Sequence, residues 1–377
     1  MITTEDYLAT VAQLRRRSGY AGRVLSGLAL SAIASGIWVS SGQAQGMPES
    51  LGRFLQQSIG MTQQEISAAG QGRPFVKVLE SPDREVAVFG IVGIGVPRKF
   101  YVDRIADSPS WVPDHSATRL GRFSDPAAAS DVKGVSVSRD DLEDLKDCRP
   151  GSCVMKLSDS AIAYIEANLD SGSPKADSVV NAYFRRRMIE YVTAYRARGN
   201  AALLVYADRK SASAAAQVFS GIVSRSPYMY RYAPSLQKYL ENYPKDRPPG
   251  AREALFWSED DLSGTRPILS ITHQVVYTPP ELPTSTLIAS KQLYANHYLD
   301  GGLVLADVVD AADASGAAPA IYVVVLSRLH FDNLPSGGLI NIRHKVSGKL
   351  KDRIAASLGL AKASSEQAYA RAGHSSR

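Results

Sequence analysis

Long β-rich segments toward the two ends of the chain, with a helical block between them, constrain the fold most strongly. Residues 74–80 and 85–97, and later 267–277, 286–298, 301–309 and 320–329, are rich in β-branched residues and bounded by turn-forming residues. Between them, residues 177–196 and 211–243 carry apolar side chains at helical spacing. Because strands and helices are segregated along the chain, we predict an α+β fold with a curved antiparallel sheet and a helical elaboration at about 155–250.

A long amphipathic helix is predicted after residue 338. Its apolar positions recur at helical spacing, at Leu339, Ile342, Val346, Leu350, Ile354 and Leu358. The opposite side is basic, with Arg343, Lys345, Lys349, Lys351 and Arg353. A basic helix face is suited to contact with anionic lipid head groups at a membrane surface. A solvated surface explains the same residues more simply, and both interpretations remain open.

The first 44 residues have the pattern of an export signal. Arg15, Arg16 and Arg17 precede a segment from Ala21 to Val39 that has no charge after Arg23, and small residues follow at Gly42 and Ala44. A retained membrane anchor is the alternative, although serines and a glycine dilute the apolar segment. We predict a signal peptide at 1–44, a single exported domain at 45–377, and a periplasmic or secreted location.

The charge of the chain argues against nucleic acid as a partner. Removal of residues 1–44 takes away four arginines and two acidic residues, which lowers the formal net charge from +6 to +4. Basic and acidic residues are interleaved over most of the remaining length, whereas nucleic-acid-binding proteins concentrate positive charge on one face.

The two cysteines, Cys148 and Cys153, flank the turn-forming pair Pro150-Gly151. In an oxidising compartment this spacing predicts a disulfide that closes a tight loop. A metal site would need further cysteine or histidine ligands nearby, and a redox motif would have two intervening residues instead of four.

The sequence contains none of the common catalytic or nucleotide-binding motifs. It has no Gly-x-Ser-x-Gly, no P-loop, no His-Glu-x-x-His and no dinucleotide-binding glycine motif before a helix. Gly90, Gly93 and Gly95 lie inside a β-rich segment, where bends or close packing explain them better than phosphate binding. The six histidines show no metal-ligand spacing, so we predict neither a metal nor a cofactor.

The most polar β segment runs from Ser290 to Tyr298. Strict alternation would place one set of side chains on one face of the sheet and a second set on the other. The first set is Ser290, Gln292, Tyr294, Asn296 and Tyr298, and the second is Lys291, Leu293, Ala295 and His297. The polar face either lines a ligand cavity or faces solvent.

His273 lies inside an apolar strand, where a buried, hydrogen-bonded structural role is the simplest interpretation. Catalysis would require a partner carboxylate or nucleophile. An enzyme of unrecognised mechanism would draw on Tyr294, His297, His273 or Lys291, and it predicts that these residues gather in one pocket. The candidate ligand-binding residues are thus His273, Ser290, Gln292, Tyr294, Asn296, His297 and Tyr298.

Two parts of the chain, Glu85 to Ala106 and Pro267 to Ala363, together resemble the helix-grip superfamily, which includes START lipid-transfer domains and polyketide cyclases. The resemblance lies in an opening strand, a short helix, a later meander and a closing long helix. It covers a little under a third of the chain and includes no diagnostic motif. It implies an apolar ligand held between a curved sheet and the last helix.

These observations predict an exported protein that binds a hydrophobic or amphiphilic, lipid-like molecule between the sheet and the final helix. An envelope enzyme and an envelope scaffold component are the alternatives. A scaffold would expose a sizeable apolar patch and have no enclosed pocket.

Overall fold

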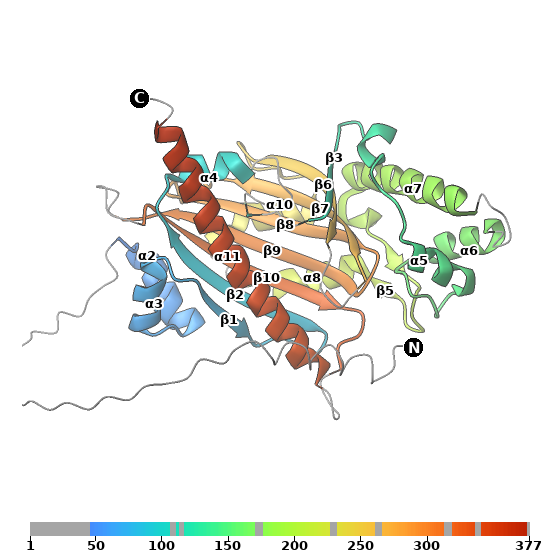
Figure 1. Cartoon of the computed structure of the whole chain (residues 1–377), viewed down its shortest axis with the longest axis horizontal. Coiled ribbons are helices and arrows are strands. Elements are labelled where there is room, and N and C mark those ends of the chain that lie inside the picture. Colours follow the sequence, from blue (N-terminus) through green and yellow to red (C-terminus); the bar gives the residue numbers. More distant parts are fainter. Residues whose placement is uncertain are drawn as a thin grey trace, which may run out of the picture. The chain divides into compact units, whose positions relative to one another are not determined.

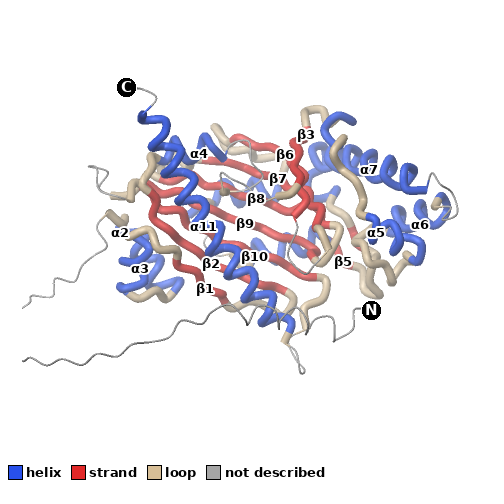
Figure 2. Tube along the Cα trace, in the orientation of Figure 1, coloured by secondary structure: helices blue, strands red, loops and turns tan. Residues whose placement is uncertain are grey.

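A computed structural model describes residues 46–105, 111–112, 117–169, 176–226, 232–260, 266–312, 319–335 and 341–374. The predicted signal, residues 1–44, lies outside these residues. The described residues belong to one compact unit. Its fold is α+β, as predicted, with a large curved antiparallel sheet and a long C-terminal helix (Figures 1 and 2).

The main sheet has the strand order β1-β2-β10-β9-β8-β7-β6-β3, and all neighbours are antiparallel. Its strands are β1 (Phe75–Leu79), β2 (Glu85–Ile94), β3 (Arg119–Phe123), β6 (Arg252–Asp260), β7 (Ile268–Tyr277), β8 (Ser285–Ala295), β9 (Leu299–Asp310) and β10 (Ile321–Phe331). A separate two-stranded sheet joins β4 (Val205–Tyr206) to β5 (Ser213–Ala214).

The helices are α2 (Glu49–Phe54), α3 (Gln63–Gly70), α4 (Arg98–Ile105), α5 (Arg139–Asp144), α6 (Asp159–Asn168), α7 (Ala176–Arg198), α8 (Ala215–Ser224), α10 (Pro234–Asn242) and α11 (Ile342–His374). Helices pack on both faces of the sheet, whereas α5 and α6 pack with α7 in a separate apolar cluster that contains no residue of the main sheet. Helix α11 crosses one face diagonally, and α8 and α10 lie behind the sheet (Figure 1). The core is therefore divided into separate apolar clusters on the two faces.

Helix α11 approaches the sheet most closely at β2. A Cβ atom built on Gly90 would lie 2.8 Å from Ile354 Cγ2 and 2.9 Å from Leu358 Cδ1, both on α11. Glycine at this position allows the backbone of β2 to pass directly beneath the helix. Close packing therefore accounts for Gly90, as the sequence indicated.

Some element bounds differ from those that the sequence predicts. The side chain of Ser158 caps α6 by accepting a hydrogen bond from the amide of Ala161. The turn between β8 and β9 lies at 296–298, because β9 begins at Leu299, and Gly301 and Gly302 are already paired with β10. Tyr298 has φ 61°, a left-handed conformation that is typical of tight turns. Strands β3 and β6 were not anticipated.

Candidate functional site

A band of small polar side chains crosses the sheet on the face that α11 covers. It contains Ser258 on β6, Ser270 and Thr272 on β7, Ser290 and Gln292 on β8, and Ser327 on β10. The strand register aligns them, because Ser258 pairs with Ser270 and Thr272 pairs with Gln292. A sheet surface that packs directly against a helix is normally apolar, so this band marks a place where packing alone does not explain the sequence.

Gly302 on β9 occupies the next position in this row, paired with Gln292. A Cβ atom at Gly302 would lie 2.7 Å from Leu329 Cδ2 and 3.1 Å from Gln292 Oε1. The glycine therefore leaves room for the amide group of Gln292 above the sheet.

A cavity of about 500 Å³ lies between the polar band and α11. Leu350, Ile354 and Leu360 of α11 contribute apolar walls, and Trp111 adds an aromatic one. Arg353 Nη2 of α11 lies 2.8 Å from Asp260 Oδ1 of β6, and both residues line the cavity. This ion pair connects the helix to the far side of the sheet while leaving the space between them open.

Gln292 carries the clearest unsatisfied group in the cavity. Its Nε2 atom is buried and has no hydrogen-bond partner within the described part of the chain. Leaving a buried amide donor unpaired costs about 1–3 kcal/mol, so a molecule in the cavity that supplies an acceptor would be stabilised there.

A β-bulge breaks the alternation that the sequence suggested for β8. The register between β7 and β8 shifts at Ile271/Thr272, so that Thr272 pairs with Gln292 but Ile271 pairs with Tyr294. Ser290 and Gln292 therefore line the α11 cavity, whereas Tyr294 packs with Leu293 in the apolar cluster on the opposite face. The expectation that Tyr294 shares the face of Ser290 and Gln292 was wrong, because a bulge inserts one extra residue.

The remaining residues of the polar segment have structural contacts near the end of β8. Asn296 Oδ1 accepts a hydrogen bond from the amide of Leu269, at 2.8 Å. His297 Nε2 lies 3.0 Å from Asp141 Oδ1, and both side chains are buried. Burial opposes ionisation of Asp141, but hydrogen bonds from His297 and Arg266 outweigh it and lower its pKa. The hydroxyl of Tyr298 accepts a hydrogen bond from the amide of Arg266.

His273 is fully buried on the face opposite α11. Its ring nitrogens lie 3.0 Å from the Tyr195 hydroxyl and 3.1 Å from Glu253 Oε2. Burial lowers the pKa of His273, although the carboxylate of Glu253 opposes this. Lys291 reaches the same apolar cluster and packs over the rings of Phe219 and Tyr195. His273 and Lys291 thus share surroundings, but His297 binds Asp141 in a separate cluster, so the four catalytic candidates do not gather at one place.

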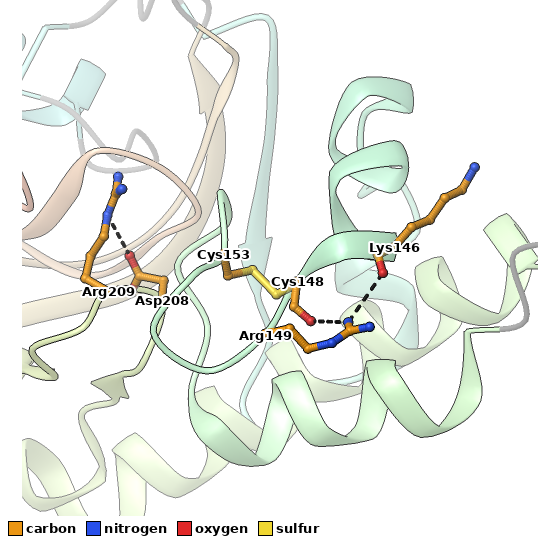
Figure 3. The surroundings of a disulfide bond; sticks show 6 residues. All are labelled: Lys146, Cys148, Arg149, Cys153, Asp208 and Arg209. Atoms are coloured by element: carbon orange, nitrogen blue, oxygen red, sulfur yellow. Dashed lines mark hydrogen bonds and ion pairs between the residues drawn. A yellow bond between two sulfur atoms is a disulfide. The ribbon is translucent and has the colours of Figure 1, made fainter. Parts of the chain in front are cut away.

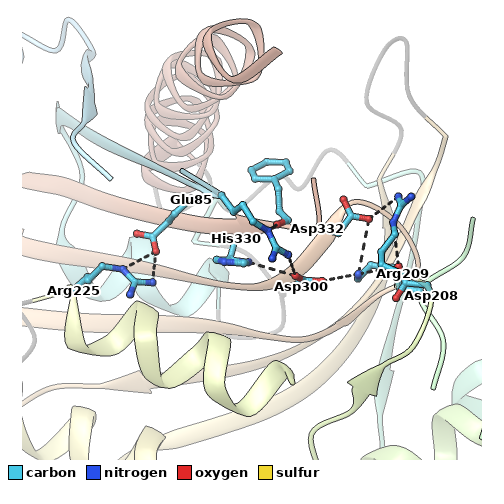
Figure 4. A network of polar contacts seen from close by, with 10 residues as sticks. Glu85, Asp208, Arg209, Arg225, Asp300, His330 and Asp332 are labelled. Carbon is cyan, nitrogen blue, oxygen red and sulfur yellow. Dashed lines mark hydrogen bonds and ion pairs between the residues drawn. The ribbon is translucent and has the colours of Figure 1, made fainter. Parts of the chain in front are cut away.

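A buried ion-pair network lies near the first residues of β9 (Figure 4). Lys156 Nζ is 2.6 Å from Asp300 Oδ1 and 3.4 Å from Asp208 Oδ2, and Arg209 Nη2 is 3.1 Å from Asp332 Oδ2. Burial disfavours the Asp300 carboxylate, but contacts with His330 and Lys156 prevail and lower its pKa. Arg84 Nη2 also lies 2.6 Å from Asp300 Oδ2, so three cations, Lys156, Arg84 and Arg209, face three aspartates. The network is adequately explained as a structural element.

The disulfide between Cys148 and Cys153 is formed, as the spacing predicted (Figure 3). Its loop binds the adjacent segment through two backbone hydrogen bonds, from Gly151 N to Ala207 O and from Cys153 N to Asp208 O. The loop therefore supports the segment that carries Asp208 and Arg209 into the ion-pair network.

No protein-family model matches the chain, and the comparison with curated proteins found no match. Within the described ranges, no helix combines the length and the apolar character needed to cross a membrane. The same ranges contain no cluster of three or more histidine, cysteine, aspartate or glutamate residues suited to a metal ion.

The sequence indicated part of the cavity and missed the rest. Ser290 and Gln292 were identified from their polar alternation, but Ser258, Ser270, Thr272 and Ser327 were not. The pair Ser270 and Thr272, two residues apart in an apolar strand, carried the same signal. Ser327 is the only serine or threonine in β10, so its strand shows no polar alternation of this kind. Only the register of β10 with β9 aligns Ser327 with the band.

Proposed function

We propose that this protein is exported and binds a hydrophobic or amphiphilic small molecule between the sheet and α11. The observation that supports this most strongly is the cavity of about 500 Å³, which has hydroxyl and amide groups on one wall and leucine and isoleucine on the other. Ligand pockets of proteins usually measure about 300–1,000 Å³ and combine apolar walls with a few placed polar groups.

The two walls suit the two parts of an amphiphile. The hydrocarbon part would lie along Leu350, Ile354 and Leu360 of α11, where it gains from burial at roughly 25 cal/mol per Å² of apolar surface. The polar part would accept a hydrogen bond from Gln292 Nε2 and exchange others with neighbouring hydroxyls. A molecule that is polar throughout would leave the apolar wall unused.

The proposed location rests on the export-signal pattern and on the disulfide. Disulfides persist in oxidising compartments and are rare in the cytosol, so Cys148–Cys153 favours a periplasmic or secreted protein. We also propose that the basic side of α11 contacts a membrane surface. Lys349 and Lys351 on this side are exposed, which is compatible with such a contact.

A cavity-filling substitution tests the proposal. Ser357 on α11 lines the cavity, and Ser357→Phe should occupy the space that the ligand needs. Ala363→Phe adds the same ring at an exposed position of the same helix and serves as the control. We expect a dansyl-labelled fatty acid to bind the unmodified protein and the control with similar affinity, and Ser357→Phe to bind it at least tenfold more weakly.

Equal binding by all three proteins would contradict the proposed location of the ligand. Two negative results together would contradict the proposed function. In the first, the unmodified protein does not bind the dansyl fatty acid. In the second, native mass spectrometry finds no amphiphile retained after incubation with a membrane lipid extract.

A further inference from the structure

A second cavity lies on the other face of the sheet, beneath α2 and α10. Its volume is about 180 Å³, and its walls are mainly apolar, with Leu51 and Phe54 from α2, Leu236 from α10, and Leu305, Val309 and Leu326 from the sheet. Because side chains alternate along a strand, this cavity is separated by the sheet from the one beneath α11.

One carboxyl group, that of Asp307 on β9, lies in this apolar wall. Its Oδ1 atom is buried and has no hydrogen-bond partner in the described ranges, and its Oδ2 atom accepts only a long hydrogen bond, 3.3 Å, from Ser285 Oγ. Among the residues described around this cavity, Asp307 is the only aspartate, glutamate, lysine or arginine. Its cross-strand neighbours are Leu287 and Val324.

The nearby guanidinium group of Arg98 is engaged elsewhere. Arg98 on α4 pairs with Asp310 at 3.1 Å and donates hydrogen bonds to Thr286 Oγ1 and to the carbonyl of Pro283. The Asp307 carboxyl thus lacks a direct ionic partner, although buried charges in proteins are normally paired.

We infer that this cavity binds a small primary amine with an apolar body, whose ammonium group pairs with Asp307. An ammonium group supplies both the missing hydrogen-bond donor and the opposite charge. A calcium ion would need six to eight oxygen ligands, which an apolar wall with one carboxyl cannot offer. A cavity of about 150 Å³ with similar walls binds benzene, so the available space suits an aromatic amine of the size of benzylamine.

The protonation of Asp307 provides a further check. Burial raises the pKa of Asp307 to about 7, against the opposing influence of Ser285 and Arg98. The charged or titratable groups around it are Arg98, which is paired with Asp310, and the phenol of Tyr232 on the cavity wall. Because an ammonium group binds the ionised carboxylate, benzylamine should bind roughly thirtyfold more weakly at pH 5.5 than at pH 8.

Isothermal titration calorimetry with benzylamine and benzyl alcohol tests the inference. At pH 8 we expect the unmodified protein to prefer benzylamine at least tenfold, and Asp307→Asn to lose this preference while binding benzyl alcohol as before. Asp352→Asn removes one acidic residue from the exposed side of α11 and is the matched charge control.

Equal affinity of the unmodified protein for the two compounds, or no binding of either, would overturn the inference. So would full retention of benzylamine binding by Asp307→Asn. If that variant fails to fold, the pH dependence of the unmodified protein decides, since an affinity that is unchanged between pH 8 and 5.5 excludes pairing with Asp307. Ser357→Phe should bind benzylamine normally, which keeps this result independent of the cavity beneath α11.

Discussion

Three polar side chains on neighbouring strands, each with a buried polar atom, have different surroundings and therefore different consequences. Gln292 has an unpaired amide in a cavity, and Asp307 has an unpaired carboxyl oxygen in a smaller one. Lys291 is fully buried among aromatic rings, where Asn200 accepts its hydrogen bond. The first two are accessible to ligands from their cavities, whereas Lys291 acts on the stability of the fold.

Replacing Lys291 with methionine should stabilise the protein at neutral pH. Burial lowers the pKa of Lys291 well below its usual value, so between the folded and the unfolded pKa the unfolded chain binds more protons at this side chain than the folded protein does. Folding therefore becomes more favourable as the pH rises toward 10. We expect Lys291→Met to raise the free energy of unfolding by about 1–2 kcal/mol at pH 7, and by less at pH 9.5.

Urea unfolding at the two pH values measures this difference. Lys351→Met, at an exposed position of α11, should change the free energy of unfolding little at either pH. A loss of stability in Lys291→Met at pH 7 would show that the ring and Asn200 contacts of the lysine outweigh the cost of its burial.

At the level of secondary structure elements, α11 shapes the main cavity by its uneven distance from the sheet. The helix packs tightly on β2, where Gly90 permits close approach, and leaves a cavity over the strands that carry the polar band. The apolar periodicity of this helix and the long β-rich strands could be read from the sequence. The distance between the helix and each strand could not be predicted from this periodicity, because it depends on contacts between side chains that are far apart in the sequence.

The bulge in β8 illustrates the same limit for the site. Ser290 and Gln292 follow simple alternation, and the sequence placed them together correctly. Tyr294 does not, because the register between β7 and β8 shifts at Ile271/Thr272. Strand β6 was missed because its residues 252–260 include charged and polar side chains at both ends, which weaken the β pattern. Asp307 was overlooked although it is the single acidic residue of the apolar segment 301–309, which is an identifiable signal.

Removal of the disulfide should weaken the fold modestly and leave ligand binding intact. A loop of this size contributes about 2 kcal/mol through the entropy of the unfolded chain, and its residues lie outside the cavity wall. We expect the Cys148→Ala/Cys153→Ala double variant to lose stability by about this amount in urea unfolding. Its affinity for the dansyl fatty acid should stay within twofold of that of the unmodified protein. A tenfold loss of affinity would indicate that the loop and the ion-pair network control the cavity.

At the level of the whole molecule, one sheet separates two cavities of different chemistry. The cavity beneath α11 pairs a polar band with an apolar helix, and the cavity beneath α2 and α10 places one carboxyl in apolar surroundings. Ligands with different head groups should therefore be distinguished by the face of the sheet on which they bind.

Photo-crosslinking with a diazirine-bearing fatty acid, followed by peptide mass spectrometry, tests the central claim most directly. The claim is that an amphiphile lies between the polar band and α11. We expect labelled peptides from α11 around Leu350 to Leu360 and from strands β7 and β8, and we expect Ser357→Phe to abolish this labelling. Labelling confined to α2 and α10, or labelling of α11 that Ser357→Phe leaves unchanged, would contradict it.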